Sequence, residues 1–211
     1  MRIAVLGTGM VGRAMSARLA ELGHDVRLGT RDPAATRARG DWVDVGSVEL
    51  MTFADATADT DLVVHAGNGL AALDLLAQAG DLAGKVLVDI SNPLDFSAGF
   101  PPTLAVKDTD SLGEQIQRAF PDARVVKTLN TLTAGLMVHP EALSEATSVF
   151  VSGDDADAKA IVTALLAELG HGDVIDLGGI VTARGPEMWM PLWLRLMGSL
   201  GTADFNLRIV R

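Results

Sequence analysis

The hydrophobic positions of this chain form short continuous runs, separated by stretches in which apolar residues recur three or four positions apart. Short apolar runs are typical of strands buried on both faces of a parallel sheet, and the wider spacing is typical of amphipathic helices. The expected strands are 2–6, 25–29, 48–53, 60–66, 85–90 and 123–127, and the expected helices are 10–22, 34–42, 70–79 and 111–120. This alternation predicts an α/β protein with a doubly wound parallel sheet.

The last third of the chain continues the pattern on a smaller scale. We expect a strand at 148–152, a helix at 154–169, a strand at 173–177 and an edge strand at 205–210. Residues 188–200 are apolar almost all round, which predicts a helix that is buried on every side and kinked at Pro191. The pattern therefore predicts a first domain at 1–145 and a smaller C-terminal α/β extension at 146–211.

Charge and composition narrow the classes of partner. The formal net charge is −10, with 17 Lys and Arg against 27 Asp and Glu, and such a chain suits neither nucleic acid nor an anionic membrane. Without cysteine there are no disulfides and no thiol chemistry. No run approaches the ~18 apolar residues of a membrane span, and the apolar start of the chain belongs to the first strand, not to a signal peptide. We therefore expect a cytoplasmic protein that binds no nucleic acid and no membrane.

The clearest motif is Gly7-Thr8-Gly9-Met10-Val11-Gly12, which lies between the first expected strand and the first expected helix. In a βαβ context this glycine spacing is typical of Rossmann-type dinucleotide-binding domains. Gly7 allows a tight turn, Gly9 lets a pyrophosphate approach the backbone, and Gly12 lets the helix pack close to the strand. The helix N-terminus then offers unpaired N–H groups to the phosphates. All six residues of the motif are candidate cofactor contacts.

The end of the second strand determines which dinucleotide binds. An NAD site places a carboxylate there for the ribose 2′-OH, whereas an NADP site places hydroxyl and guanidinium donors there for the 2′-phosphate. Thr30 and Arg31 come first, and an arginine suits a bidentate contact with phosphate. Asp32 follows, and a small shift of the strand end would bring its carboxylate to the ribose. The residue order favours NADP(H), with Arg37 or Arg39 as more distant support.

The later strands end in small and amide side chains. Ala66-Gly67-Asn68-Gly69 follows the fourth expected strand, Ser91-Asn92-Pro93 the fifth, and Thr128-Leu129-Asn130-Thr131 the sixth. The carboxyl ends of parallel strands meet at the edge where ligands bind. Further candidate cofactor contacts are therefore Ala66, Gly67, Asn68, Asn92, Pro93 and Asn130. The loop 94–107, which includes Phe96 to Pro102, suits a lid or a substrate wall.

Two sets of ionisable residues are interpreted as structural. His65 lies inside the fourth expected strand, which favours a core or edge histidine with a satisfied ring over a catalytic one. Asp154, Asp155 and Asp157 lie in the first turn of an expected helix, where carboxylates complement the helix dipole. They lack the alternating ligands and the bidentate glutamate of a calcium loop. We therefore predict no metal site.

Several of these motifs together resemble one known family. The order and spacing of 7–12, Gly29-Thr30-Arg31-Asp32-Pro33, Ser91-Asn92-Pro93 and 125–131 resemble the coenzyme F-420-dependent NADP oxidoreductases, and the related reductase domain of the six-transmembrane metalloreductases looks similar. The resemblance continues through 149–155, 176–179 and the Trp-rich helix after Pro186. It implies a Rossmann domain that binds NADP(H), a C-terminal part that completes a cleft, and hydride transfer to a flavin-like ring. The family pattern would have an apolar residue, a proline and a bulky aromatic residue at Gly67-Asn68-Gly69.

Three functions remain open at this point. The leading hypothesis is an oxidoreductase that passes hydride between NADP(H) and a deazaflavin (F-420) or flavin, a reaction that needs no acid, base or nucleophile from the chain. An imine or carbonyl reductase of the pyrroline-carboxylate type needs a proton donor, for which Thr128, Asn130, Thr131 and His139 are candidates. A non-catalytic NADP(H) sensor is the third, and the loop at 67–69 favours it.

The leading hypothesis carries two structural expectations. Asn92 and Asn130 would orient the acceptor ring or the nicotinamide amide, while 96–102 and the helix near Trp189 would exclude water. The same apolar helix has more large side chains than a small module can cover, which predicts a homodimer. Its expected contacts are Trp189, Trp193, Leu196 and Met197.

Overall fold

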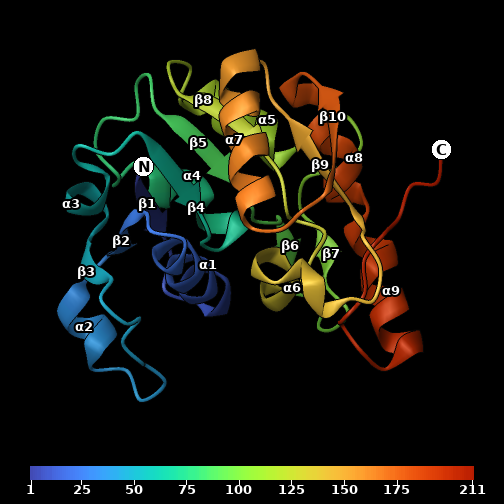
Figure 1. Ribbon diagram of the computed structural model, residues 1–211, viewed down its shortest axis with the longest axis horizontal. Coiled ribbons are helices and arrows are strands. Elements are labelled where there is room, and N and C mark those ends of the chain that lie inside the picture. The colour runs from blue at the N-terminus through green and yellow to red at the C-terminus, as the bar shows by residue number, and fades with distance from the viewer.

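The computed structural model describes residues 1–211, and its centre is an eight-stranded sheet between two layers of helices (Figure 1). The strands lie in the order β10-β9-β8-β5-β4-β1-β2-β3. Their bounds are β1 Arg2–Leu6, β2 Asp25–Thr30, β3 Glu49–Thr52, β4 Leu62–His65, β5 Val86–Asp89, β8 Arg124–Lys127, β9 Ser148–Ser152 and β10 Asp173–Gly178. The order reverses between β1 and β4, and in such a sheet ligands bind outside that point. The predicted α/β, Rossmann-type fold is confirmed.

The strand register sets up this binding edge. All neighbouring strands are parallel except β8 and β9, which pair antiparallel through Lys127 and Ser152 alone. Leu6 and Gly29 are paired, Leu6 is also paired with His65, and the row continues through Asp89 to Lys127. The loops after these strands therefore start side by side along one edge. The division of the chain into two domains at residue 145 stays a prediction. The strands after that residue, β9 and β10, belong to the same sheet as β1.

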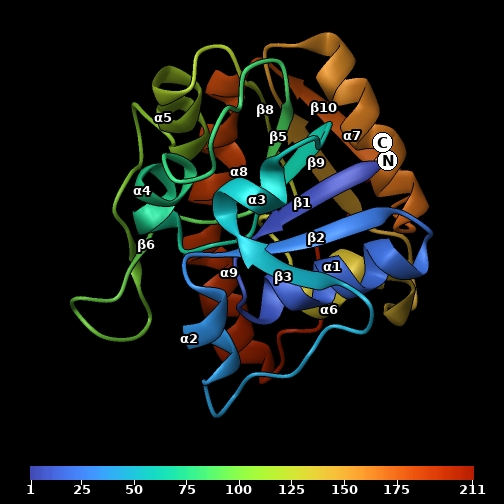
Figure 2. The ribbon, with the colours of Figure 1, turned by 90° about the vertical axis from the view of Figure 1, so that its left-hand side faces the viewer.

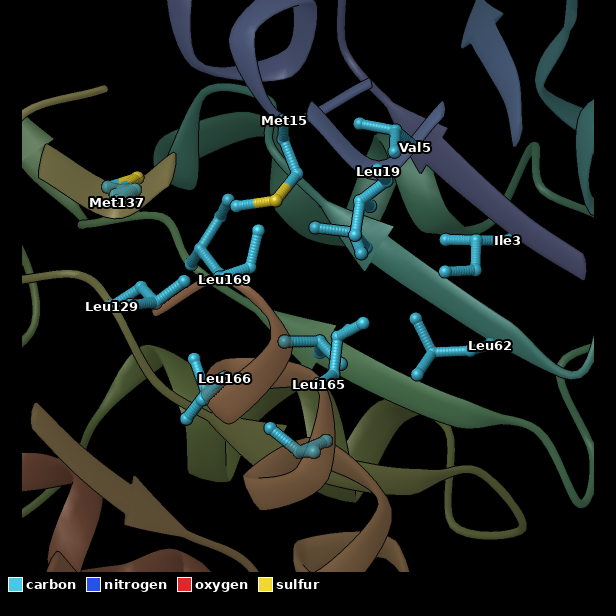
Figure 3. Packing of buried hydrophobic residues seen from close by; sticks show 14 of the residues in the cluster. Ile3, Val5, Met15, Leu19, Leu62, Leu129, Met137, Leu165, Leu166 and Leu169 are labelled. Carbon is cyan, nitrogen blue, oxygen red and sulfur yellow. The ribbon is translucent and has the colours of Figure 1, made fainter. Parts of the chain in front are cut away.

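Helices cover both faces of the sheet, as Figure 2 shows from the side. One face carries α1 Met10–Glu21, α6 Ala134–Val138 and α7 Ala156–Glu168, and the other carries α3 Phe53–Thr57, α4 Ala72–Leu76 and α5 Leu112–Ala119. On the first face, Met15 of α1, Met137 of α6 and Leu165 of α7 belong to one buried cluster with Ile3 and Leu62 of the sheet (Figure 3). Burial of these apolar side chains is the main force that holds the layers together.

The remaining elements are short except α9, which has 11 residues. They are α2 Pro33–Arg37, β6 Leu94–Asp95, β7 Thr103–Leu104, α8 Arg184–Met188, α9 Met190–Leu200 and the 3-10 turns η1 Gly69–Ala71, η2 Pro140–Ala142 and η3 Ile180–Ala183. The helices expected at 34–42 and 70–79 end early, and the loop 94–107 contains the small antiparallel pair β6 and β7. No helix is long and apolar enough to cross a bilayer, and the cytoplasmic location stays a prediction.

The apolar C-terminal helix differs from its prediction. Pro191 lies in the first turn of α9, where the N–H that proline lacks has no helical partner, so it starts a helix and does not kink one. Trp193 is buried and stacks on Phe205, with ring centroids 5.3 Å apart, but Leu192 remains 49% exposed. The expectation of burial on every side is therefore wrong, because α9 packs through one face only.

The expected edge strand at 205–210 is also wrong. The segment is irregular, and its backbone meets β9 through the N–H of Ser148, which donates to the carbonyl of Leu207 at 2.9 Å. The side-chain amide of Asn206 donates to the carbonyl of Ser148 at 3.1 Å, and the hydroxyl of Ser148 accepts from the N–H of Ile209 at 2.9 Å. Side chains thus occupy groups that a strand ladder would need.

Candidate active site

The glycine-rich loop has the geometry of a phosphate cradle. Gly7 has a φ of +124°, and a Cβ on Gly12 would lie 1.8 Å from the carbonyl oxygen of Gly7. Gly12 is therefore the contact that lets α1 lie close to the end of β1. Gly9 is the N-cap of α1 with no side-chain cap, and a Cβ there would meet no atom within 4 Å. The first N–H groups of the twelve-residue helix α1 are thus open to an anion.

The end of β2 carries an exposed guanidinium group and a carboxylate that caps the next helix. Asp32 is the N-cap of α2, and its Oδ1 accepts from the N–H of Ala35 at 2.9 Å. The hydroxyl of Thr30 is buried and shares a 2.8 Å hydrogen bond with Thr36. The side chain of Arg31 is exposed at the same strand end. Arg31 is thus an exposed cation at the end of β2.

Arg39 lies beyond α2 and reaches back to the glycine-rich loop. Its Nη1 donates to Thr8 Oγ1 at 3.1 Å and its Nη2 to the carbonyl of Thr8 at 3.2 Å. Its Nε donates to Asp41 Oδ1 at 3.1 Å, which fixes the guanidinium in place. Arg37 instead donates to the carbonyl of Leu50 on β3. Of the two supporting arginines considered from the sequence, Arg39 is the one at the glycine-rich loop.

A cleft of about 280 Å³ lies at the edge where the strand order reverses. Its lining residues come from α1, from α6 and from the segments that follow β4, β5 and β8: Val11, Ala66, Gly67, Asn68, Gly69, Ile90, Ser91, Asn92, Leu94, Phe96, Leu132 and Met137. Five of the predicted contacts, Val11, Ala66, Gly67, Asn68 and Asn92, thus come together. None of the twelve lining side chains is ionisable at neutral pH.

The loops after β4 and β5 approach each other closely because residue 69 is glycine. A Cβ on Gly69 would lie 2.2 Å from the carbonyl oxygen of Asn92 and 2.9 Å from the nitrogen of Pro93. At Gly67 the corresponding Cβ would lie 2.5 Å from Leu75 Cδ1. The Oδ1 of Asn68 accepts from the N–H of Leu70 at 2.9 Å and so caps η1. The Gly67-Asn68-Gly69 loop is therefore ordered by its own contacts.

Asn92 and Asn130 bond to each other across the carboxyl ends of β5 and β8. Asn92 Nδ2 donates to the carbonyl of Asn130 at 2.7 Å, and Asn130 Nδ2 donates to Asn92 Oδ1 at 2.9 Å. Asn130 Nδ2 also donates to the carbonyl of Pro186 at 3.0 Å, and Asn130 is 2% exposed. Asn130 thus holds Asn92 in the cleft wall and is not itself a lining residue.

Below the cleft lies a buried group of ionisable side chains that the sequence analysis did not find. Lys127 Nζ lies 2.7 Å from Asp89 Oδ2 and 3.0 Å from Glu187 Oε1, and all three side chains are at most 1% exposed. His65 Nδ1 lies 2.9 Å from Asp89 Oδ1. The available signal was a charged residue at the carboxyl end of each of two strands, Asp89 of β5 and Lys127 of β8.

Electrostatics keeps Asp89 and Lys127 charged. Burial opposes ionisation of Asp89, but the Lys127 ammonium and the His65 ring outweigh it and hold the pKa of the Asp89 carboxyl far below its usual range. Burial likewise opposes the charge on Lys127, and the carboxylates of Asp89 and Glu187 outweigh it and raise the pKa of that ammonium. His65 is buried and bonded to Asp89, as a core histidine would be, but its Nε2 has no partner, so the ring is not fully satisfied and the structural interpretation stays a prediction.

Other candidate residues lie away from the cleft or are enclosed. His139 is exposed and hydrogen-bonded to Glu141 at 2.9 Å, and Thr128 and Thr131 are buried. Trp189 does not line the cleft but a separate apolar cavity of about 200 Å³. Asp155 caps α7, and Asp154 accepts from the N–H of Ile180 at 2.8 Å. No group of three or more His, Asp or Glu side chains in the chain is arranged to hold a metal ion.

The chain combines a Rossmann-type sheet with an open glycine-rich loop, a basic strand end and a cleft at the point where the strand order reverses. Together these features are typical of a dinucleotide-binding oxidoreductase. The family model for NADP oxidoreductases that depend on coenzyme F420 matches residues 2–93. The F420-dependent NADP reductase of Methanothermobacter thermautotrophicus is 30% identical over 93% of this chain and 89% of its own length. A crystal structure of an Arthrobacter sp. FB24 protein, provisionally assigned as an F420-dependent NADP reductase, is 59% identical over the full length of both chains, with a TM-score of 0.97.

The chain therefore belongs to the F420-dependent NADP reductase family, a family of NADP-dependent oxidoreductases. The predicted resemblance is confirmed. The metalloreductase STEAP3 of Rattus norvegicus is also similar, at 27% identity over 91% of this chain, but the chain spans only 38% of the length of that protein.

Proposed function

We propose that this protein transfers hydride between NADP(H), held along the glycine-rich loop, and a deazaflavin of the F420 type, held in the cleft. The observation that carries the proposal is the cleft itself, which adjoins the glycine-rich loop through Val11 and has no ionisable lining side chain. NADPH supplies the hydride from its nicotinamide ring when it is bound. The chain then has to hold two flat rings in contact and exclude water.

The cofactor fits the residues present. The open N-terminus of α1 at Gly9 suits the pyrophosphate. Arg31 and Arg39 suit the 2′-phosphate, since Arg31 is exposed at the end of β2 and Arg39 lies against Thr8. Asp32 caps α2 with the carboxylate that an NAD site would offer to the ribose. These contacts support NADP(H) as the coenzyme.

The nicotinamide half would then lie at Ala66, Gly67 and Asn92. Because Asn130 is bonded to Asn92 and is itself held by the carbonyl of Pro186, we assign Asn130 a positioning role. Leu94 and Phe96 line the outer side of the cleft, and the Phe96 ring is 58% exposed in the free protein. A flat acceptor ring that covered Phe96 would remove this apolar surface from water.

The test is NADPH oxidation with F420, a flavin and a cyclic imine as alternative acceptors. We expect turnover with F420 above all, and a kcat that is unchanged within twofold by His139→Ala, because that ring lies outside the cleft. Asn130→Ala should lower kcat about tenfold, since a displaced nicotinamide loses the near-attack geometry. A rate of NADPH oxidation that depends steeply on pH, and loses that dependence in His139→Ala, would favour the imine or carbonyl reductase. Failure to reduce any of the three acceptors would favour the NADP(H) sensor.

We also propose that the protein is a homodimer whose contact lies on α8 and α9. Met188, Leu192, Leu196 and Leu200 follow one another at intervals of four residues, so they form one stripe along these helices. Leu192 is 49% exposed and Leu200 is 57% exposed. Trp193, expected in the contact from the sequence, is buried in its own chain. An exposed apolar stripe of this kind is typical of an interface.

The dimer is tested by light scattering at micromolar concentration. The wild-type protein should have the mass of two chains, and Leu192→Glu/Leu200→Glu the mass of one, because burial of two carboxylates in the contact is costly. Val181→Glu is the matched control, since Val181 is also 49% exposed but lies on η3. A monomeric wild-type protein would rule the dimer out.

A further inference from the structure

The buried ionisable group below the cleft costs more to bury than an apolar core would. Its charged members are Asp89, Lys127 and Glu187, each at most 1% exposed. Apolar residues of similar volume often replace such buried ion pairs with no loss of stability. Stability alone is therefore a weak reason for three buried charges at this place. Their contacts with residues of the cleft indicate a role in shaping the cleft.

Ser91 is the cleft residue that this group holds. Asp89 Oδ1 accepts from the Ser91 N–H at 3.1 Å and from its hydroxyl at 2.8 Å. Lys127 Nζ donates to the Ser91 carbonyl at 2.6 Å. The backbone donor, the backbone acceptor and the side chain of one lining residue are thus all bound to the same ion pair. Asn92, the next residue, also lines the cleft, so its place in the cleft wall depends on where Ser91 is held.

Glu187 connects the same ammonium group to the C-terminal part of the chain. Its Oε2 accepts from the N–H of Leu112 at 2.8 Å and its Oε1 from the N–H of Gly113 at 3.1 Å, both at the N-terminus of α5. Pro186, the residue before it, accepts the hydrogen bond from Asn130. Helix α8 is therefore tied to the cleft floor through Lys127 and through Asn130.

We propose that Lys127, held between Asp89 and Glu187, is a positioning residue that fixes the Ser91-Asn92-Pro93 loop for the nicotinamide half of the coenzyme. Lys127 touches neither coenzyme nor acceptor, because its ammonium is fully enclosed beneath Ser91. It acts through the Ser91 carbonyl and so sets where Asn92 stands in the cleft wall. This inference rests on the proposed place of the nicotinamide half in the cleft.

The test compares whole-coenzyme binding with binding of the adenosine half alone. Calorimetry with NADPH and with adenosine 2′,5′-bisphosphate is carried out on the wild type and on Asp89→Asn/Lys127→Met/Glu187→Gln. The triple variant removes all three charges together, so no charge stays buried without a partner. We expect an unchanged Kd for the bisphosphate, within twofold, a Kd for NADPH raised about tenfold, and a kcat lowered at least tenfold.

A control of the same residue types is the partly exposed pair Lys159 and Asp176, which lies on α7 and β10. Lys159 Nζ lies 2.8 Å from Asp176 Oδ2 and also donates to a backbone carbonyl, that of Gly178, at 3.2 Å. Lys159→Met/Asp176→Asn should leave both Kd values and kcat unchanged. It therefore separates loss of a lysine–aspartate pair in general from loss of this one.

Glu187→Gln is the second variant, for the case in which the triple variant does not fold. It leaves one buried cation beside one buried anion, and it should raise the Kd for NADPH and lower kcat by about threefold each, with the bisphosphate unaffected. Folded variants that bind NADPH and turn over like the wild type overturn the inference, whatever their melting temperature. A wild-type protein that binds NADPH no more tightly than the bisphosphate, or that reduces no acceptor, contradicts the proposed function instead.

Discussion

Arg31→Ala/Arg39→Ala is expected to lower the affinity for NADPH about a hundredfold or more while leaving the affinity for NADH within threefold. A charged hydrogen bond to phosphate contributes on the order of 1.5–3 kcal/mol, so each arginine accounts for roughly a tenfold to hundredfold change. The two effects will not add fully, because both guanidinium groups would bind the same phosphate. NADH lacks that phosphate, so its binding does not depend on either group.

Calorimetry with both coenzymes checks this result on the double variant and on each single variant. Arg37→Ala is the matched control, because Arg37 donates to the carbonyl of Leu50 and should leave the preference for NADPH unchanged. Arg39 also bonds to Thr8 in the free protein, so Arg39→Lys reports whether the forked group itself is needed. If the double variant keeps the wild-type preference, the 2′-phosphate does not lie between these two arginines.

Gly12→Ala is expected to abolish measurable NADPH binding and to lower the melting temperature. The added Cβ would lie 1.8 Å from the carbonyl oxygen of Gly7, a backbone atom that cannot rotate away. Helix α1 would have to move off the end of β1, and overpacking of this kind costs about 1–3 kcal/mol of stability or more. The same movement takes the N–H groups of α1 away from the phosphates.

Two other glycines separate these effects. At Gly135, in α6, a Cβ meets no atom within 4 Å, so Gly135→Ala should keep both stability and binding. At Gly9 the space is equally open. Gly9→Ala should keep the melting temperature but raise the Kd for NADPH about tenfold, because the added Cβ stands where the pyrophosphate approaches the backbone. A Gly12→Ala protein with wild-type affinity would mean that the coenzyme binds elsewhere.

The candidate site was only partly predictable from the sequence. Glycine spacing between an apolar run and an amphipathic helix located the phosphate cradle, because that geometry depends on residues within a few positions of one another. The side chain of Asp32 was ambiguous, since its role depends on whether α2 begins after it. In the structure the carboxylate caps α2 through its Oδ1.

The buried ion group could not be found in the same way. Lys127 is 38 residues from Asp89, and Glu187 is 75 residues from the Leu112 N–H that it accepts. Nothing near Lys127 in the chain indicates a partner, and only the register of β5 against β8 brings the two side chains together. The prediction of a strand at 205–210 failed for a related reason. The side-chain amide of Asn206 donates to the carbonyl of Ser148 on β9, which a strand-to-strand hydrogen bond would have used.

The sequence by itself determined the eight strands of the main sheet, the main helices, the doubly wound order, the glycine-rich loop after β1 and the small residues at the carboxyl edge. These follow from hydrophobic periodicity and from glycine, which act over short stretches of chain. The tertiary structure alone decided that Arg39 turns back to Thr8, that Asn130 holds Asn92, and that Lys127 lies between Asp89 and Glu187 beneath Ser91. Each of these contacts joins segments far apart in the chain, and a polar side chain takes its partner from whatever the packing of the sheet and helices places beside it.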